Sequence, residues 1–211
     1  MTVATLAWFV AASAGLALSP GPDILTVITR SITQGVRAGL VATLGFASGV
    51  AVHTTAAALG LALLLRESPK AFLGVQIAGV VYLLYLALRV LMSREAISID
   101  GESPQQVRAL GRIYWQSVLM NILNPKVTLF FLAFLPQFVR PDDAVGLPVQ
   151  FAIYGGLFAL STIICFGSCA LMAGNLTAWL RKKPGAAKPM RIGTALIFVL
   201  IAARLALARL N

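Results

Sequence analysis

Long apolar runs separated by short polar connections dominate the pattern of this chain. A membrane-spanning helix needs ~20 largely apolar residues, and the runs approach or exceed that length. The first run is similar to the core of a signal peptide, but no Lys or Arg precedes it and further runs follow, so we interpret it as a membrane helix. The sequence therefore predicts an all-α membrane protein with six transmembrane helices, at about residues 3–18, 38–65, 71–92, 113–139, 149–176 and 191–208.

The composition agrees with a membrane setting. Hydrophobic residues make up 59% of the 211 residues and charged residues only 11%, which is too apolar for an ordinary soluble domain. The net charge of +10 would suit a nucleic-acid partner, but the basic residues lie in the connections and form no basic and aromatic patch. We therefore expect membrane lipid, and no nucleic acid, as a partner.

The basic residues also predict an orientation. Eleven of the 17 Lys and Arg residues fall in or beside the first, third and fifth connections, five fall on the opposite side, and Lys126 lies within a run. Positively charged connections tend to stay in the cytoplasm. The sequence therefore predicts that both termini lie outside the cytoplasm.

Two proline-containing motifs interrupt the first and fourth predicted helices. Proline donates no helix hydrogen bond and clashes with the preceding turn, so each motif must break its helix. In hydrocarbon the freed backbone groups have no water partner, and such breaks are tolerated mainly where they line a cavity or are covered by protein. The two motifs are Ser19-Pro20-Gly21-Pro22-Asp23 and Asn124-Pro125-Lys126. Together they suggest a transport site.

The two halves of the chain repeat one another. Aligning Pro22 with Pro125 sets Asp23 opposite Lys126 and leaves three predicted helices in each half. An odd number of spans turns the second copy upside down in the membrane, as in the inverted repeats of many secondary transporters. We predict one transporter domain over residues 1–211, with repeat one at about 1–94, a cytoplasmic loop at about 95–112 and repeat two at about 113–211.

Each motif is also able to start a new helix. Asn124 and Pro125 have the residue types of an N-cap and a first helical position, and Gly21-Pro22 or Ser19-Pro20 can do the same in the first half. Amides exposed at a helix start carry partial positive charge. Two such starts inside the membrane therefore predict a binding site for an anionic group such as a carboxylate. The alternative is a plain kink that serves packing.

Asp23 and Lys126 are the ionisable residues beside the breaks. A charge near the middle of a bilayer costs roughly 2.5–3.5 kcal/mol on insertion scales and is usually paired or lines a wet path. Lys126 also opposes the dipole of the helix that it starts. One hypothesis is an Asp23–Lys126 pair that a substrate carboxylate or a proton can open. The other is that Asp23 caps a helix near the membrane interface while Lys126 snorkels.

Other polar and small residues allow two interpretations each. His53, the single histidine, is either a hydrogen-bonded packing residue or a proton relay. Gly49 either lets another helix approach closely or lines a path, and Asn121 either holds a polar group of a substrate or joins two helices by a hydrogen bond. Cys165 and Cys169 lie four residues apart in an apolar run and are interpreted as packing residues, with no metal site.

Further segments accompany the proline motifs, namely Gly45-x3-Gly49-x3-His53, Gly79-Val80-Val81-Tyr82-Leu83-Leu84-Tyr85-Leu86-x2-Arg89, Asn121-Ile122-Leu123 and Phe130-Phe131-Leu132-x2-Leu135-Pro136-Gln137-Phe138. Together they resemble the LysE/RhtB family, the lysine exporter and threonine-homoserine efflux type, over nearly the whole chain. The resemblance implies a six-span carrier of the bacterial inner membrane that exports amino acids against proton influx. On the predicted orientation, both termini would then be periplasmic. Family-like positions are Pro20, Gly21, Pro22, Gly45, Gly49, His53, Asn124, Pro125 and Lys126.

The chain departs from the family pattern at two places. Many relatives carry Asn or another neutral residue where Asp23 stands, and the exporters of lysine and arginine carry an acidic residue near the place of Gly49. A carboxylate for a basic side chain is therefore missing from the second predicted helix. The resemblance then implies neutral substrates such as threonine, homoserine or leucine-like molecules.

Our hypothesis is a non-enzymatic secondary transporter that works by alternating access, without a cofactor and with a homodimer as a compatible assembly. The proton would pass Asp23 or His53. An intramembrane enzyme would need a Ser–His pair, two aspartates or a metal cluster, and the spans offer one Asp and one His. A cation or lipid transporter on the same broken-helix plan is the other alternative. The predicted substrate-binding residues are Pro20, Gly21, Pro22, Asp23, Gly49, Asn121, Asn124, Pro125 and Lys126.

Overall fold

Helices make up all of the regular structure in the described part of the chain. The structure is a computed structural model that describes residues 1–19, 21–67, 69–92, 109–140, 142–182 and 187–207. The elements are α1 (Val3–Leu18), α2 (Pro22–Gln34), α3 (Val36–Glu67), α4 (Pro69–Met92), α5 (Leu110–Ile122), α6 (Pro125–Leu129), the π-helix η1 (Phe130–Phe134), the 3₁₀-helix η2 (Leu135–Phe138), α7 (Leu147–Lys182) and α8 (Ala187–Leu207). The prediction of an all-α protein is confirmed.

Both predicted helix breaks are present. The axes of α1 and α2 differ by 60°, and those of α5 and the segment Pro125–Phe138 differ by 47°. In each case the second helix begins at a proline, Pro22 in α2 and Pro125 in α6. A proline fits this first position because the missing amide has no helix partner there anyway.

The lengths of the apolar helices fit a membrane protein. Helices α3 and α7 are long and apolar enough to cross a membrane, over Val36–Gly60 and Leu147–Asn175. Counting each bent pair as one span brings the number to four among the residues searched. Helices α4 and α8 contain the shorter apolar sections Ile77–Met92 and Ile192–Ala203. Six spans therefore stay a prediction.

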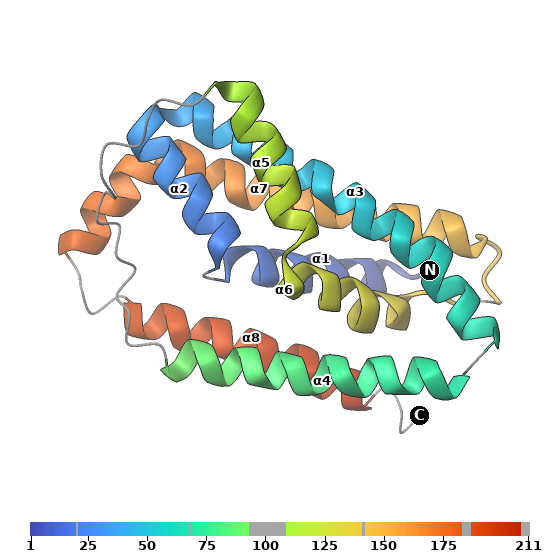
Figure 1. The fold of residues 1–211 in the computed structure, drawn as a ribbon. Coiled ribbons are helices and arrows are strands. Elements are labelled where there is room, and N and C mark those ends of the chain that lie inside the picture. The colour runs from blue at the N-terminus through green and yellow to red at the C-terminus, as the bar shows by residue number, and fades with distance from the viewer. Residues whose placement is uncertain (20, 68, 93–108, 141, 183–186, 208–211) are drawn as a thin grey trace.

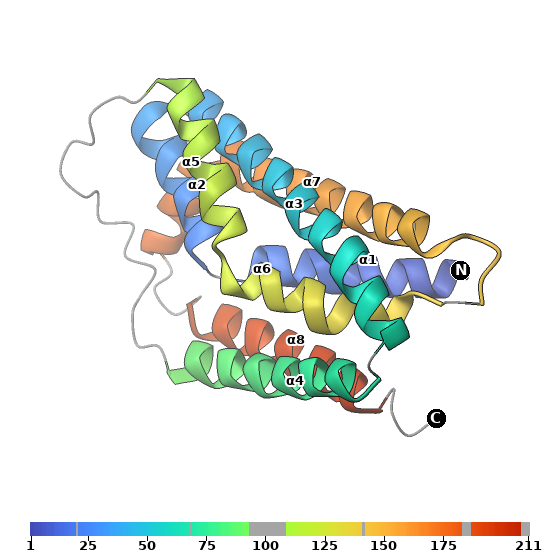
Figure 2. The same ribbon diagram turned by 45° about the vertical axis from the view of Figure 1, so that its right-hand side comes forward.

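The helix ends gather at two opposite ends of the bundle (Figure 1; Figure 2). One end, which we call the basic end, holds the last residues of α2, α4 and α7 and the first residues of α3, α5 and α8. The other, the terminal end, is where α1 begins and α8 finishes. Helices α3 and α7 lie side by side, as do α4 and α8, and α1 and α6 lie between these two pairs.

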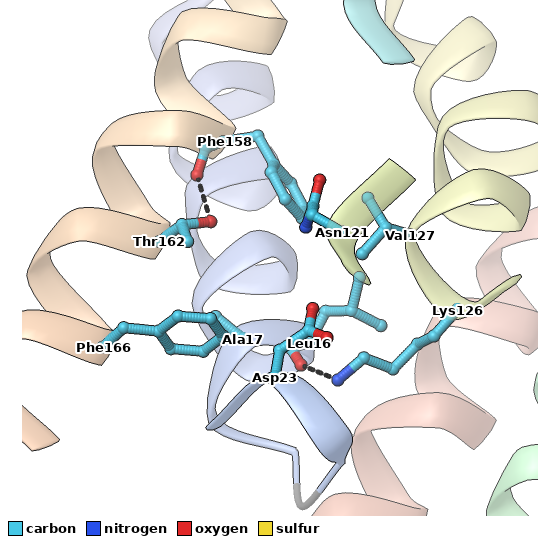
Figure 3. A pocket seen from close by; sticks show the side chains of 9 residues that line it. All are labelled: Leu16, Ala17, Asp23, Asn121, Lys126, Val127, Phe158, Thr162 and Phe166. Carbon is cyan, nitrogen blue, oxygen red and sulfur yellow. Dashed lines mark hydrogen bonds between the residues drawn. The ribbon is translucent and has the colours of Figure 1, made fainter. Parts of the chain in front are cut away.

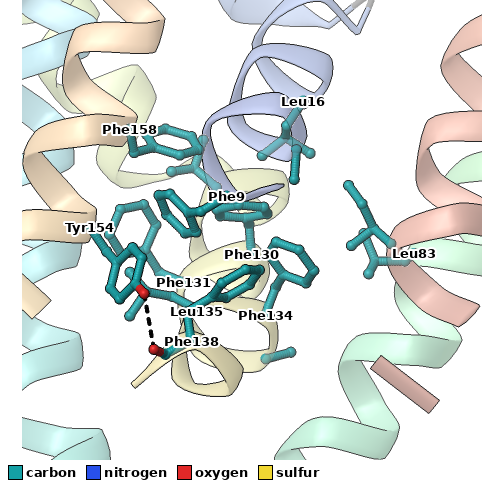
Figure 4. Packing of buried hydrophobic residues seen from close by; sticks show 14 of the residues in the cluster. Phe9, Leu16, Leu83, Phe130, Phe131, Phe134, Leu135, Phe138, Tyr154 and Phe158 are labelled. Carbon is teal, nitrogen blue, oxygen red and sulfur yellow. Dashed lines mark hydrogen bonds between the residues drawn. The ribbon is translucent and has the colours of Figure 1, made fainter. Parts of the chain in front are cut away.

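Two hydrophobic clusters fill the interior. The aromatic cluster lies toward the terminal end, where neighbouring ring centroids are 4.8–6.2 Å apart (Figure 4). It comprises Phe9, Phe130, Phe131, Phe134, Phe138, Tyr154 and Phe158. The alanine-rich cluster lies toward the basic end and comprises Ala17, Ile24, Val27, Ile28, Ala38, Ala42, Phe46, Ile113, Phe166, Ala170 and Ala173.

Small residues let α3 approach its neighbours closely. A Cβ atom at Gly45 would lie 2.5 Å from the Tyr114 carbonyl oxygen of α5. On the other side, a Cβ at Gly155 of α7 would lie 2.2 Å from Thr54 Oγ1. These positions are therefore packing contacts of the backbone, which is common between membrane helices.

The connection between η2 and α7 is held by side chains at the terminal end. Gln150 accepts a hydrogen bond from the Arg140 amide at 2.9 Å and donates to the Arg140 and Val145 carbonyls at 2.8 and 2.6 Å. The α-amino group of Met1 forms an ion pair with Asp143. Two hydrogen bonds hold the pKa of the Asp143 carboxyl below its usual value: the one from this amino group has the larger effect, and the one from the Val145 amide the smaller.

Candidate functional site

A small cavity lies beside the two helix breaks, between the aromatic and the alanine-rich clusters (Figure 3). Its volume, measured as room for the centres of water-sized spheres, is about 10 Å³, which is the space of a single water molecule. Asp23, Asn121 and Lys126 point into it from α2, α5 and α6. The lining residues are Leu16, Ala17, Asp23, Asn121, Lys126, Val127, Phe158, Thr162 and Phe166.

Asp23 lies in the first turn of α2 and is buried, with 2% of its surface exposed. The Asn121 and Asn124 side chains lie next to its carboxylate, and Lys126 and His53 are within electrostatic reach. Within the described part of the chain, Asp23 Oδ1 has no hydrogen-bond partner. Burying a carboxylate without a partner is costly, so this oxygen is an open acceptor beside the cavity.

Lys126 does not form the predicted ion pair. Among the described residues no Asp23–Lys126 contact of 4.0 Å or less exists. Lys126 Nζ instead donates to the carbonyl oxygens of Leu16 at 3.0 Å and Ser19 at 3.4 Å, at the end of α1. The ammonium therefore reaches across to another broken helix, and the position of Asp23 relative to the membrane interface stays a prediction.

Asn124 is the N-cap of α6, as predicted. Its Oδ1 accepts a hydrogen bond from the Lys126 amide at 3.0 Å, and its carbonyl accepts from Val127 and Thr128, both at 3.1 Å. The amides that were expected to bind a carboxylate after Pro125 are therefore already taken. Asn124 Nδ2 is buried and has no partner among the described residues, so the side-chain amide is the group that this break leaves available.

The start of α2 is organised differently. Gly21 is its N-cap and has no side chain to hold the following amides. A Cβ atom on Gly21 would lie 3.3 Å from Lys126 Nζ, so glycine leaves room for the ammonium beside the chain. Pro22 and Pro125 are exposed and do not line the cavity. Pro20 lies outside the described residues.

Asn121, His53 and Gly49 form a connected group where α3 meets α5. His53 Nε2 donates to the Asn121 carbonyl at 3.1 Å, and its ring lies 5.6 Å from the ring of Phe131. A Cβ atom on Gly49 would lie 2.7 Å from Asn121 Cβ and Oδ1. His53 and Gly49 thus position Asn121, and neither lines the cavity.

Three lining residues of α7, Phe158, Thr162 and Phe166, were not predicted. Thr162 donates its hydroxyl to the Phe158 carbonyl at 2.9 Å, and Phe166 packs edge-on to Phe46. Nothing in α7 breaks the helix or carries a charge there. No sequence signal of the kind used for the proline breaks marks these residues.

Known proteins similar to this chain match nearly its whole length. The family described as LysE type translocator matches residues 14–209. Homoserine/homoserine lactone efflux proteins of Salmonella typhimurium and Salmonella typhi are each 30% identical over 194 residues, or 92% of both chains. An uncharacterized membrane protein of Pseudomonas aeruginosa is 32% identical over 202 residues, covering 92% of this chain and 91% of the relative. No solved structure matches the chain. The resemblance inferred from the motifs is confirmed, and the chain belongs to the LysE type translocator family.

Proposed function

We propose that this translocator exports neutral amino acids by alternating access, with proton antiport. One observation carries the proposal: Asp23 and Asn121, each with a buried polar atom that lacks a hydrogen-bond partner among the described residues, line a small cavity beside two helix breaks. The unpartnered Asn124 side-chain amide lies next to the Asp23 carboxylate. Unpartnered buried polar groups are costly unless a ligand or water satisfies them. The names of the two Salmonella relatives support an amino-acid substrate.

In the proposed cycle, this conformation with its small cavity is a step between substrate entry and release. Phe158 of the aromatic cluster, together with Leu16 and Val127 packed against that cluster, lines one side, and Ala17 and Phe166 of the alanine-rich cluster line the other. A cavity of about 10 Å³ has no room for an amino acid. Substrate entry and release therefore require the alanine-rich cluster to open toward the basic end and the aromatic cluster to open toward the terminal end, in turn.

The charges of the cavity suit a zwitterion. Asp23 and Lys126 are the charged residues among those that line it. The ammonium of a substrate would bind the Asp23 carboxylate and the Asn121 side-chain oxygen, and its carboxylate would bind Asn124 Nδ2 and the uncapped start of α2. A basic or acidic side chain would leave one charge unpaired in a low-dielectric site, which is strongly unfavourable. Neutral amino acids such as homoserine and threonine fit best.

Proton antiport would use Asp23, with His53 as the second candidate. Asp23 is the acidic residue at the cavity, so a proton and a substrate ammonium would compete for the same carboxylate. Such competition couples the two fluxes, because the carboxylate cannot hold both at once. His53 is close enough to interact electrostatically with Asp23.

The remaining parts of the proposal concern topology. We propose six spans arranged as two inverted three-helix repeats that rock against each other, in the bacterial inner membrane. The basic end would face the cytoplasm, as the distribution of Lys and Arg indicates. Both termini would then be periplasmic, and the start of α1 and the end of α8 do lie together at the terminal end (Figure 1).

Transport into proteoliposomes tests the function. With the vesicle interior acidic, proton efflux should drive uptake of labelled homoserine, and Asp23→Asn should abolish this driven uptake. Asp142→Asn, at an exposed loop position, is the matched control and should behave like the wild type. Unlabelled lysine should compete at least about tenfold more weakly than threonine, since one unpaired buried charge costs more than ~1.4 kcal/mol.

The results that would overturn the proposal are specific. If the wild type does not exchange labelled for unlabelled homoserine, the substrate assignment is wrong. If exchange occurs but does not respond to the pH gradient, and Asp23→Asn behaves like the wild type, only the proposed proton coupling is wrong.

A further inference from the structure

The end of α1 lacks hydrogen-bond donors for reasons visible in the sequence. In an uninterrupted helix the carbonyl of Leu16 would accept from the amide of residue 20, and that of Leu18 from residue 22. Both positions are proline, which has no amide hydrogen. The last backbone hydrogen bond of α1 is donated by the Ser19 amide to the Gly15 carbonyl, with a nitrogen–oxygen distance of 3.1 Å. The carbonyls beyond it need donors from elsewhere.

Lys126 supplies donors from the other break. Its Nζ lies 3.0 Å from the Leu16 carbonyl oxygen and 3.4 Å from that of Ser19. Carbonyl oxygens at a helix C-terminus carry partial negative charge, so a cation there is favoured by the dipole of α1 even though it opposes that of α6. Gly21 provides space, because a Cβ there would be 3.3 Å from Nζ.

The acceptors around this ammonium are those that a free monovalent cation would use. Two backbone carbonyls at the end of a broken helix and a nearby carboxylate, Asp23, form the kind of oxygen-rich site at which discontinuous membrane helices bind coupling cations. Here the site already contains a positive charge that is covalently attached to the chain. An ammonium carries three N–H donors and no acceptor, so it can replace a cation at carbonyl oxygens.

We propose that Lys126 is a tethered cation: its ammonium occupies the carbonyl site at the end of α1 in place of Na⁺ or K⁺, so that the translocator needs neither ion to fold or to work. The inference deepens the proposed function and rests on it for the transport cycle. Lys126 is then a positioning residue that holds the end of α1 to the start of α6.

Replacement of Lys126 by alanine tests the inference. In choline chloride the Lys126→Ala protein should unfold at a lower temperature than the wild type, and homoserine exchange should fall at least about tenfold, the effect of losing one hydrogen bond to a charged group. Na⁺ or n-propylammonium, which replaces the missing part of the side chain, should raise the unfolding temperature and restore exchange. The wild type should respond to neither cation.

Two control variants frame the experiment. Lys126→Arg keeps a cation at the site and should show no dependence on added cations. Lys70→Ala removes an exposed lysine at the start of α4 and should behave as the wild type in every salt. A lower unfolding temperature of Lys126→Ala that neither cation raises would overturn the inference, as would a wild type that requires Na⁺ or K⁺. Failure to obtain folded Lys126→Ala with any cation present would also contradict it.

The unfolding temperature separates the two proposals. It reports occupation of the carbonyl site without any substrate. If cations stabilise Lys126→Ala but the wild type exchanges no amino acid, the tethered cation stands and the proposed substrate fails. If exchange occurs but Lys126→Ala is as stable and as active in choline as the wild type, the proposed function stands and the tethered cation fails.

Discussion

Gly49 is the position where a single methyl group should disturb the candidate site most directly. A Cβ atom there would lie 2.7 Å from Asn121 Cβ and Oδ1 and 3.0 Å from Cγ. Carbon atoms in contact are normally about 3.5–4.0 Å apart. In Gly49→Ala, Asn121 or the whole of α5 must therefore move away from α3 by on the order of 0.8 Å.

The energetic effect has two opposing parts. Alanine is favoured over glycine inside a helix by about 1 kcal/mol, whereas overpacking a tight contact costs about 1–3 kcal/mol. Gly156 of α7 provides the matched control, because it is exposed and a Cβ there meets nothing within 4 Å. Gly156→Ala should therefore gain only the stability that comes from the higher helix propensity of alanine. The difference between the variants is then the overpacking cost, equivalent to roughly 2–12 °C in unfolding temperature for a chain of this size.

Function should respond more strongly than stability. Asn121 lines the cavity, and its side chain lies beside the Asp23 carboxylate. Displacing a group that positions a ligand by about 1 Å can cost on the order of 100-fold in rate. We expect homoserine exchange by Gly49→Ala to fall at least about tenfold, with Gly156→Ala unchanged. If the two variants unfold at the same temperature and exchange equally fast, the close approach of α3 to Asn121 has no role in the site.

Substitutions at three further positions separate stability from transport, each measured by thermal unfolding and by homoserine exchange. Asn124→Ala should lose the N-cap at a cost of about 0.5–2 kcal/mol. Asn124→Asp should keep the cap but stop exchange by adding a carboxylate beside Asp23, and full activity of this variant would contradict the assignment of the side-chain amide. His53→Leu removes one donor to the Asn121 carbonyl and should cost about 0.5–1.5 kcal/mol, while His53→Gln, which keeps a donor, should recover part of it; equal loss in both would refute the hydrogen-bonding role. Tyr154→Phe removes the 3.0 Å hydrogen bond to the Phe138 carbonyl but keeps the ring, so it should cost about 0.5–1.5 kcal/mol with exchange retained; loss of exchange would mean that the hydroxyl itself serves transport.

Local chemistry explains which parts of this structure could be predicted from the sequence. The breaks before Pro22 and Pro125 depend only on the missing amide and on the clash with the preceding turn, so the sequence is enough to place them. The Asn124 N-cap is equally local. The repeat alignment brought Asp23 and Lys126 to corresponding breaks, and both residues do line one cavity.

The direction of the Lys126 side chain could not be predicted in this way. It depends on which helix end lies within reach of its flexible four-carbon stem in the folded chain, and the end of α1 competes with Asp23 for the same ammonium. The part of α7 at the cavity is a second example. Thr162 and Phe166 line it because α7 crosses beside α1 and α2, which is a property of tertiary packing that no local pattern carries.

The two proline breaks solve the same backbone problem by different means, and the difference indicates which one moves. At the second break the hydrogen-bonding groups find partners close by: Asn124 caps the start of α6, and the Asn121 carbonyl accepts from the Asn124 amide and from His53. At the first break the end of α1 depends on Lys126 from the other half of the chain. Breaking the two hydrogen bonds of Lys126 releases the end of α1 from α6 without disturbing any hydrogen bond inside either helix. The α1–α2 break is therefore the cheaper one to rearrange, and we expect the opening of the cavity to begin there.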